Sequence, residues 1–281
     1  SQALAGFRPS LLALALFSLC INLLLLAPAI YMLQVYDRVI TSGSLPTLLM
    51  LTVVLLFLFL TIGALEWVRA QILLRLGLRL ELALDDRVFD VAFREALYSG
   101  GREAQGQALA DLSGLRQYLA GPGPVALFDV PWLPVYLLVM YLLHPLFGLV
   151  GLLSAAVLMG LALLNARVSR QPMEELSDAT AESNAFVARN LRNAEVVESM
   201  GMLADIRRHW QQRHFRLLGS HARAAARSSA LGSVSRVFRL AVQSMVLGLG
   251  AWLVIEQRVT PGVMIAGSIL LGRALAPVDM L

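Results

Sequence analysis

The sequence predicts an all-α membrane protein with six membrane-spanning helices. Two observations carry this prediction. Hydrophobic residues make up 58% of the 281 residues and charged residues only 15%, and the intervals between charged residues are repeatedly as long as a membrane span. Soluble domains contain about 45–50% apolar and about 25% charged residues, so the excess here indicates surface that faces lipid. The mean hydropathy of +0.69 agrees with this, and we expect one domain.

The six spans are expected where apolar runs reach membrane length. A helix needs about 20 mostly apolar residues to cross roughly 30 Å of hydrocarbon. The first run is too long for a cleavable signal peptide and is therefore expected to be a membrane helix. A long charge-free stretch is divided in two by the turn at His144-Pro145. The expected spans cover about residues 10–36, 45–65, 121–143, 145–166, 231–255 and 261–281.

Two charged stretches, residues 66–120 and 167–230, keep helical periodicity where loops would otherwise be expected. In the first, leucines and valines recur every three or four residues, while arginines and aspartates fall on the opposite side. A helix over residues 45–97 would be about 80 Å long, and the bilayer accounts for only roughly 30 Å of it. The pattern predicts two cytoplasmic helical hairpins. The first turn contains Gly100, Gly101 and Gly106, followed by a helix-compatible run over residues 108–118, and the second turn contains residues 186–202.

Arginine placement predicts the topology. All 23 basic residues are arginines, and with a cytoplasmic N-terminus only Arg38 and Arg258 lie outside. This asymmetry follows the tendency of positive residues to stay on the cytoplasmic side. The pI near 9.7 is therefore explained by topology, and nucleic-acid binding is not expected.

Several kinds of chemistry are excluded by the residue inventory. The chain has no lysine, so it holds no P-loop, whose lysine contacts the nucleotide phosphates. We expect no ATP hydrolysis by this segment. Cys20 is the single cysteine and the histidines form no H-x-x-x-H pair, so no disulfide, metal, cofactor or catalytic site is expected.

Four ionisable residues near the expected spans are candidates for a translocation pathway: Arg236, Arg239, Arg273 and Asp129. An arginine at mid-helix costs about 2.5–3.5 kcal/mol on insertion scales, so such residues usually face a cavity or a partner. Snorkelling to the interface is the alternative for the arginines. Asp129 is expected to pair with an arginine of a neighbouring helix. An intramembrane aspartyl protease would need a second carboxylate at membrane depth, and only the helix-end Asp37 is available.

Five segments resemble the transmembrane domain of bacterial type I secretion ABC transporters, in the branch that exports proteases and lipases. The strings FDVPWLP and NAEVVESMGM are the most specific, and the resemblance covers nearly the whole chain. The segments are residues 31–48 (YMLQVYDRVITSGSLPTL), 109–136 (LADLSGLRQYLAGPGPVALFDVPWLPVY), 144–148 (HPLFG), 192–203 (RNAEVVESMGML) and 273–279 (RALAPVD).

The resemblance implies the six-helix ABC exporter type 1 domain, acting as a homodimer in the bacterial inner membrane. It implies a nucleotide-binding domain that carries ATP and Mg²⁺, a periplasmic membrane-fusion adaptor and an outer-membrane channel. Substrates would be unfolded proteins with C-terminal signals. A nucleotide-binding domain is expected after residue 281, outside this segment, and a peptidase-like domain is not expected before Ser1.

The same resemblance implies that the two hairpin turns are coupling helices, which dock on the ATPase domains. The polar contact candidates are Asp111, Arg116, Glu195 and Glu198, although each of these charges could instead simply solvate a turn.

Two other functions fit the same helices. The first is an ABC exporter of peptides or lipids, which neighbouring genes for an adaptor and a channel would argue against. The second, from another class, is a membrane channel or intramembrane enzyme, which a chain ending near residue 281 without an ATPase partner would favour.

Overall fold

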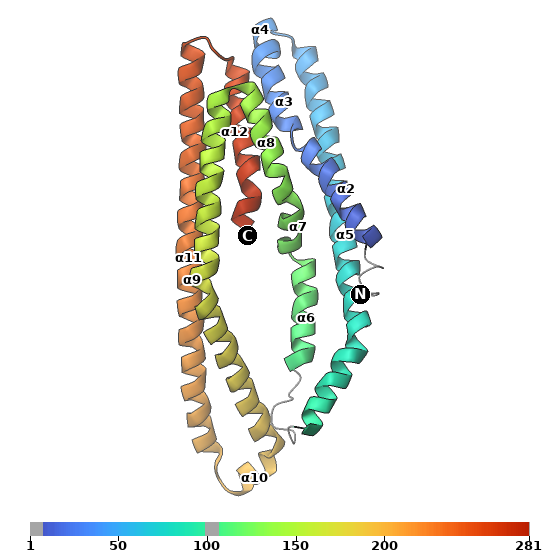
Figure 1. The fold of residues 1–281 in the computed structure, drawn as a ribbon, viewed down its shortest axis with the longest axis vertical. Coiled ribbons are helices and arrows are strands. Elements are labelled where there is room, and N and C mark those ends of the chain that lie inside the picture. Colours follow the sequence, from blue (N-terminus) through green and yellow to red (C-terminus); the bar gives the residue numbers. More distant parts are fainter. Residues whose placement is uncertain (1–7, 99–106, 281) are drawn as a thin grey trace. The chain divides into compact units, whose positions relative to one another are not determined.

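The structure, a computed structural model, describes residues 8–98 and 107–280 and shows helices joined by short turns (Figure 1). The turn of the first predicted hairpin falls partly on residues 99–106, outside the described residues. In chain order the elements are α2 (Arg8–Leu24), α3 (Ala27–Gln34), the π-helix η1 (Val35–Val39), α4 (Ile40–Ser42), α5 (Leu45–Tyr98), α6 (Gln107–Ala120), α7 (Pro122–Asp129), the 3₁₀ helix η2 (Val130–Trp132), α8 (Leu133–Leu143), α9 (Pro145–Arg192), α10 (Ala194–Ser199), α11 (Leu203–Ile255), α12 (Pro261–Leu275) and the 3₁₀ helix η3 (Ala276–Met280).

Within the described residues, six helical stretches are long and apolar enough to cross a membrane. They coincide in order with the six expected spans. The long helices were also expected: α5 has 54 residues without interruption, and α9 and α11 have 48 and 53 residues. The predicted second turn, residues 186–202, contains the end of α9 and the short helix α10 with its two connections.

Proline explains where the structure departs from the expected continuous spans. The first span breaks between α2 and α3, just before Pro28, and the third passes through η2, which contains Pro131. Proline lacks a backbone N–H and its ring crowds the preceding turn, so regular α-helical hydrogen bonding stops there. The last α-helix ends at Leu275 and continues as η3 around Pro277, short of the predicted end at residue 281.

The chain folds as two compact units. The first comprises Ser1–Asp90, Ala108–Met159 and Arg236–Leu281, and the second comprises Val91–Gln107 and Gly160–Ser235.

In the first unit, α12 lies at the centre and packs against α3 and α8. Half of its most apolar stretch is buried, whereas only 6% of the corresponding stretch of α5 is buried. The ring of Phe147, fully buried, lies against Gly267 of α12, where a Cβ would come within 3.2 Å of it. The apolar surface of α5 is left for lipid or for another chain to cover.

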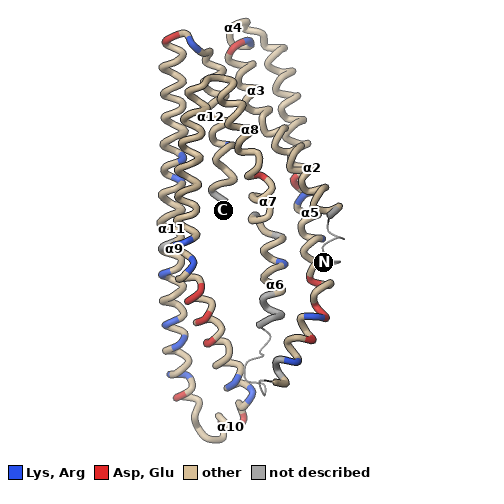
Figure 2. The backbone as a smooth tube through the Cα atoms, viewed as in Figure 1, with Lys and Arg blue, Asp and Glu red and all other residues tan. Residues whose placement is uncertain are grey.

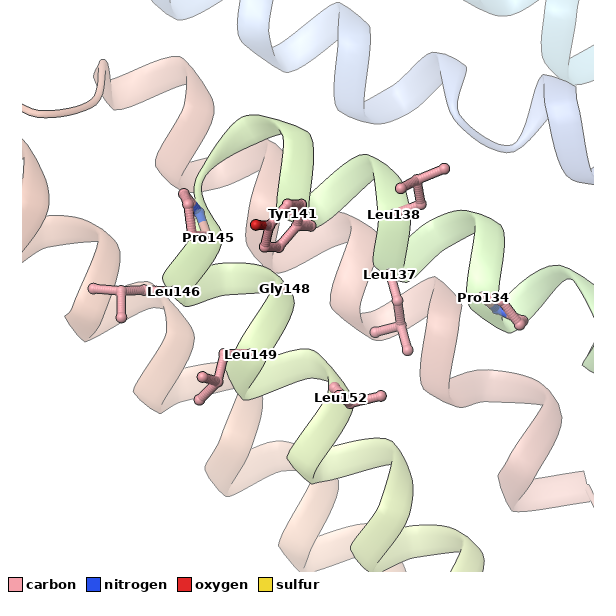
Figure 3. A pocket seen from close by; sticks show the side chains of 9 residues that line it. All are labelled: Pro134, Leu137, Leu138, Tyr141, Pro145, Leu146, Gly148, Leu149 and Leu152. Carbon is pink, nitrogen blue, oxygen red and sulfur yellow. The ribbon is translucent and has the colours of Figure 1, made fainter.

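Helices α8 and α9 of the same unit approach each other closely through glycines. A Cβ on Gly148 would lie 2.6 Å from the Tyr141 Cβ, and one on Gly151 would lie 2.8 Å from Leu137. Small residues let membrane helices pack backbone to backbone. The two helices also line an apolar groove of about 530 Å³. Pro134 of α8 and Leu152 of α9 lie at the end of this groove that is farther from the turn at Pro145 (Figure 3).

In the second unit, α9 and α11 are joined by polar and aromatic contacts. Arg213 Nε donates to Glu182 Oε1 at 3.2 Å, and its guanidinium carbon lies 4.3 Å from the centre of the Phe186 ring. Trp210 and His214 stack along α11, with ring centres 4.9 Å apart. Figure 2 shows that the charges of α9 and α11 gather on the half of each helix nearer α10.

Candidate functional site

The last residue of α7, Asp129, carries the most heavily engaged carboxylate among the described residues of the membrane spans. Its Oδ1 accepts hydrogen bonds from Ser18 Oγ at 2.7 Å, Asn22 Nδ2 at 2.9 Å and Arg69 Nη1 at 3.2 Å. Ser18 also donates to the Phe128 carbonyl at 3.1 Å. The end of α7 is therefore fastened to α2 and to α5.

Arg69 and Asp129 form an ion pair with little access to water. The side chains are 9% and 19% exposed, respectively. Charges removed from water are costly unless they are paired and their remaining hydrogen-bonding positions are filled. Here the neutral donors Ser18 and Asn22 add to the arginine, so the carboxylate is well satisfied.

Asn22 extends these contacts to α8. The hydroxyl of Tyr136 donates toward the Asn22 backbone carbonyl and its amide oxygen, both at 3.0 Å. The Asn22 amide nitrogen also donates to the Ser18 carbonyl at 2.9 Å. Ser18 and Asn22 lie four residues apart and therefore share one face of α2. We call the five residues Ser18, Asn22, Arg69, Asp129 and Tyr136 the polar network.

The polar network joins the first three spans and is suited to hold helices, not to perform acid–base chemistry. It contains one carboxylate, and the second one considered for a protease, Asp37, is engaged elsewhere by Thr260 and Gly262. Among the described residues, no group of three or more His, Cys, Asp or Glu is placed to hold a metal ion.

Sequence reasoning expected an arginine partner for Asp129 but did not identify Arg69, and it missed Ser18, Asn22 and Tyr136. A signal was present for two of these. Asn22 is the one amide within the first half of an apolar run, and Ser18 lies one helical turn before it. Polar side chains at membrane depth usually bond across helices. Arg69 gave no such signal because it follows the end of its expected span.

The three candidate pathway arginines lie on the last two spans. Arg236 is exposed and Arg239 is half-buried on α11, and Arg273 is exposed on the last turn of α12. Their role in a pathway remains a prediction.

The four coupling-helix candidates lie in two different settings. Glu195 and Glu198 are exposed on α10. Arg116 of α6 instead donates from Nη1 to Glu81 Oε2 of α5 at 2.9 Å, and thus holds α6 against α5. The side chain of Asp111, also on α6, lies outside the described residues.

A family model described as the ABC transporter transmembrane region matches residues 11–276. The chain belongs to this family. This family is the one that the resemblance to exporters implied, and the apolar runs had predicted the six candidate spans found among the described residues.

Similar proteins point to one branch of the family. The type I secretion system ATP-binding protein PrsD of Rhizobium meliloti strain 1021 is 38% identical over 280 residues, which is 100% of this chain and 48% of PrsD. The alpha-hemolysin translocation ATP-binding protein HlyB of Escherichia coli O157:H7 is 22% identical over 275 residues, 97% of this chain and 39% of HlyB. The chain is therefore an ABC exporter membrane domain homologous to type I secretion proteins.

A solved structure supports the same fold. A bacterial Atm1-family ABC exporter with ATP bound aligns with a TM-score of 0.82 at 12% identity, over 98% of this chain and 50% of that one. This ABC transporter transmembrane region spans 48% of PrsD, 39% of HlyB and 50% of the Atm1-family exporter, and thus at most half the length of each.

Proposed function

We propose that this chain is the transmembrane domain of an ATP-driven type I secretion exporter that moves unfolded proteins with C-terminal signals out of the cytoplasm. The observation that carries the proposal is the 38% identity to a type I secretion protein along the whole chain. The long helices α5, α9 and α11 support it, because rigid elements longer than the bilayer are suited to transmit movement from the cytoplasm to the membrane.

The energy for transport comes from a nucleotide-binding domain that holds ATP and Mg²⁺, since this chain has no lysine for a P-loop. We place one docking site for that domain on α10. The helix has exposed carboxylates at Glu195 and Glu198 and an exposed apolar side chain at Val196, and the residue that follows it, Met200, is also exposed. Exposed apolar groups rimmed by charges are typical of protein interfaces. Asp111 and Arg116 remain candidates for the other docking turn, although Arg116 is already engaged by Glu81.

Two copies of the chain enclose the pathway, and each contributes Arg236, Arg239 and Arg273. Guanidinium groups in a cavity attract acidic segments of an unfolded substrate. Asp129 contributes differently: its bonds to Arg69 and α2 keep the walls of the pathway in place. This role fits its engagement better than direct contact with substrate.

The exporter lies in the bacterial inner membrane with its N-terminus in the cytoplasm, which the arginine distribution supports. Outside the membrane it works with a membrane-fusion adaptor and an outer-membrane channel.

Val196 offers a sharp test of the docking role of α10. Val196→Ser in the complete exporter should lower secretion while ATP hydrolysis continues, because the movement of the ATPase is no longer transmitted. Val234→Ser on α11 is the matched control, since the two valines are 55% and 52% exposed. Secretion and ATP hydrolysis are measured on the same membranes. If replacement of the whole of α10 by a glycine-serine segment left secretion intact, the docking role would be wrong.

A further inference from the structure

Asp37 of η1 makes two contacts with the beginning of α12, more than 220 residues later in the chain. Its Oδ2 accepts a hydrogen bond from Thr260 Oγ1 at 2.6 Å, and its Oδ1 accepts one from the Gly262 backbone N–H at 2.9 Å. Thr260 Oγ1 in turn accepts from the Val263 N–H at 3.3 Å. Two of the N–H groups that every helix leaves unpaired at its start are satisfied in this way.

Electrostatics favours this arrangement. The N-terminus of a helix carries a partial positive charge, and a carboxylate placed there is stabilised. Asp37 therefore provides the negative charge that an Asp or Glu in the first turn of a helix usually provides, although Asp37 belongs to the first span and not to α12. The bond is tertiary and ties two spans together.

The π-helix η1 sets the position of Asp37 on its own span. The Ile40 N–H donates to the Val35 carbonyl, a bond across five residues. A π-turn holds more residues than an α-turn, so the side chains after it are rotated relative to a regular α-helix. Such turns are rare and are frequent at functional sites.

Gly262 makes the close approach possible. A Cβ at this position would stand 2.6 Å from Asp37 Oδ1 and 2.7 Å from its carboxyl carbon. Gly262 is also buried. No side chain larger than hydrogen fits without moving the carboxylate off the helix.

The contact continues along both helices. Beyond η1, α12 packs on α3. The buried Ala29 of α3 and Ala266 of α12 border a pocket of about 80 Å³ together with Leu33. Small residues on both sides allow close packing.

We propose that Asp37, Thr260 and Gly262 form a clamp that keeps the outer ends of the first and last spans together throughout transport. The two spans then move as one body, and the pathway opens along other helix boundaries. The position of this clamp on the outer side of the membrane and its behaviour during transport rest on the proposed function. The contact itself does not depend on that function.

The first experiment tests the contact without reference to transport. In the detergent-solubilised protein, Asp37→Ala and Gly262→Ala are each expected to lower the midpoint of thermal unfolding by roughly 2–4 °C, the usual shift for loss of one helix cap in a chain of this size. The double variant should lose less than the sum, because without the carboxylate the added methyl meets no clash. Gly248→Ala on α11 is the control, since a Cβ there meets nothing within 4 Å. Additive losses would overturn the clamp whatever the protein transports.

The second experiment tests whether the clamp stays closed. In the complete exporter with Cys20→Ala, Asp37→Cys alone should reduce secretion several-fold. Adding Thr260→Cys and joining the two thiols with a short bis-methanethiosulfonate, which forms a disulfide with each thiol and releases sulfinate, should restore most of it. A reductant cleaves these disulfides and should reverse the gain. If the joined protein secretes less than the single variant, the spans must separate during transport and the proposal is wrong. Absence of secretion by the unaltered exporter would instead refute the proposed function, while the first experiment would still decide the contact.

Discussion

Arg69 donates from Nη1 to both carboxylate oxygens of Asp129, at 3.2 and 3.4 Å, and thereby links the second span to the third. The same carboxylate is bonded to Ser18 and Asn22 of the first span. The first three spans therefore meet at one carboxylate, and loss of this charge should weaken the packing of all three.

Removal of one partner of this ion pair should be strongly destabilising. Arg69→Ala leaves Asp129 buried without its cation, which we expect to cost about 3 kcal/mol of unfolding free energy. The combined change Arg69→Met with Asp129→Leu should cost clearly less, because no charge is left unpaired. Chemical unfolding in detergent measures both. Arg170→Ala, which breaks an exposed pair with Glu174, is the control and should cause no measurable change. A double variant as unstable as the single one would contradict a buried pair.

Loss of the Tyr136 hydroxyl should weaken the network at its far end. Tyr136→Phe keeps the ring but removes the donor to Asn22, and we expect a loss of about 1 kcal/mol. Tyr141→Phe on the same helix is the matched control, since Tyr141 is 56% exposed. Equal unfolding midpoints for the two variants would show that the Tyr136 hydroxyl contributes nothing.

Two glycines on α9 should respond in opposite ways to alanine. At Gly148 the new methyl would clash with the Cβ and Cα of Tyr141, so we expect a loss of roughly 1–3 kcal/mol from forced separation of α8 and α9. At Gly160 a Cβ meets nothing within 4 Å, so the better helix propensity of alanine should leave stability unchanged or raise it by up to about 1 kcal/mol. Unfolding curves for the two variants decide this. Similar curves would argue against the close α8–α9 contact.

Arg213→Lys should loosen the contact between α9 and α11 near Glu182. Lysine keeps the charge but loses the planar group that lies over the Phe186 ring. We expect a local loss of about 0.5–1 kcal/mol, visible as faster amide hydrogen exchange around residues 182–186. Arg216→Lys, an exposed position on the same helix, should leave exchange unchanged. Unchanged exchange in the Arg213 variant would show that the flat guanidinium is not needed.

Most of the fold could be predicted because membrane helices are read from composition and length. The six spans follow from apolar runs, and the continuous helix α5 follows from the lack of proline between Pro46 and Pro122. The breaks at Pro28 and Pro131 could also have been anticipated, but whether a proline kinks or ends a span depends on its neighbours. The π-turn at Val35–Val39 has no sequence signature and becomes visible only from its hydrogen bonds.

The site was less predictable because it is built from pairs across the sequence. An arginine partner for Asp129 was expected on energetic grounds, yet the choice of Arg69 depends on how α5 packs against α7. For Arg116, the sequence suggested a contact with another domain where the fold provides an internal partner. Its charge at a turn suggested docking, whereas the structure places it on Glu81. One sequence does not reveal which of its charges meet within the fold.

Cysteine accessibility in whole cells tests the membrane arrangement most directly. In a Cys20→Ala background, single cysteines at Leu82, Glu198 and Gln257 would be treated with a thiol reagent that does not cross the membrane. The account predicts that Gln257→Cys is labelled in intact cells, whereas Leu82→Cys and Glu198→Cys are labelled only after the inner membrane is opened. Labelling of the Leu82 and Glu198 positions in intact cells would place the long helices on the outside and contradict the exporter.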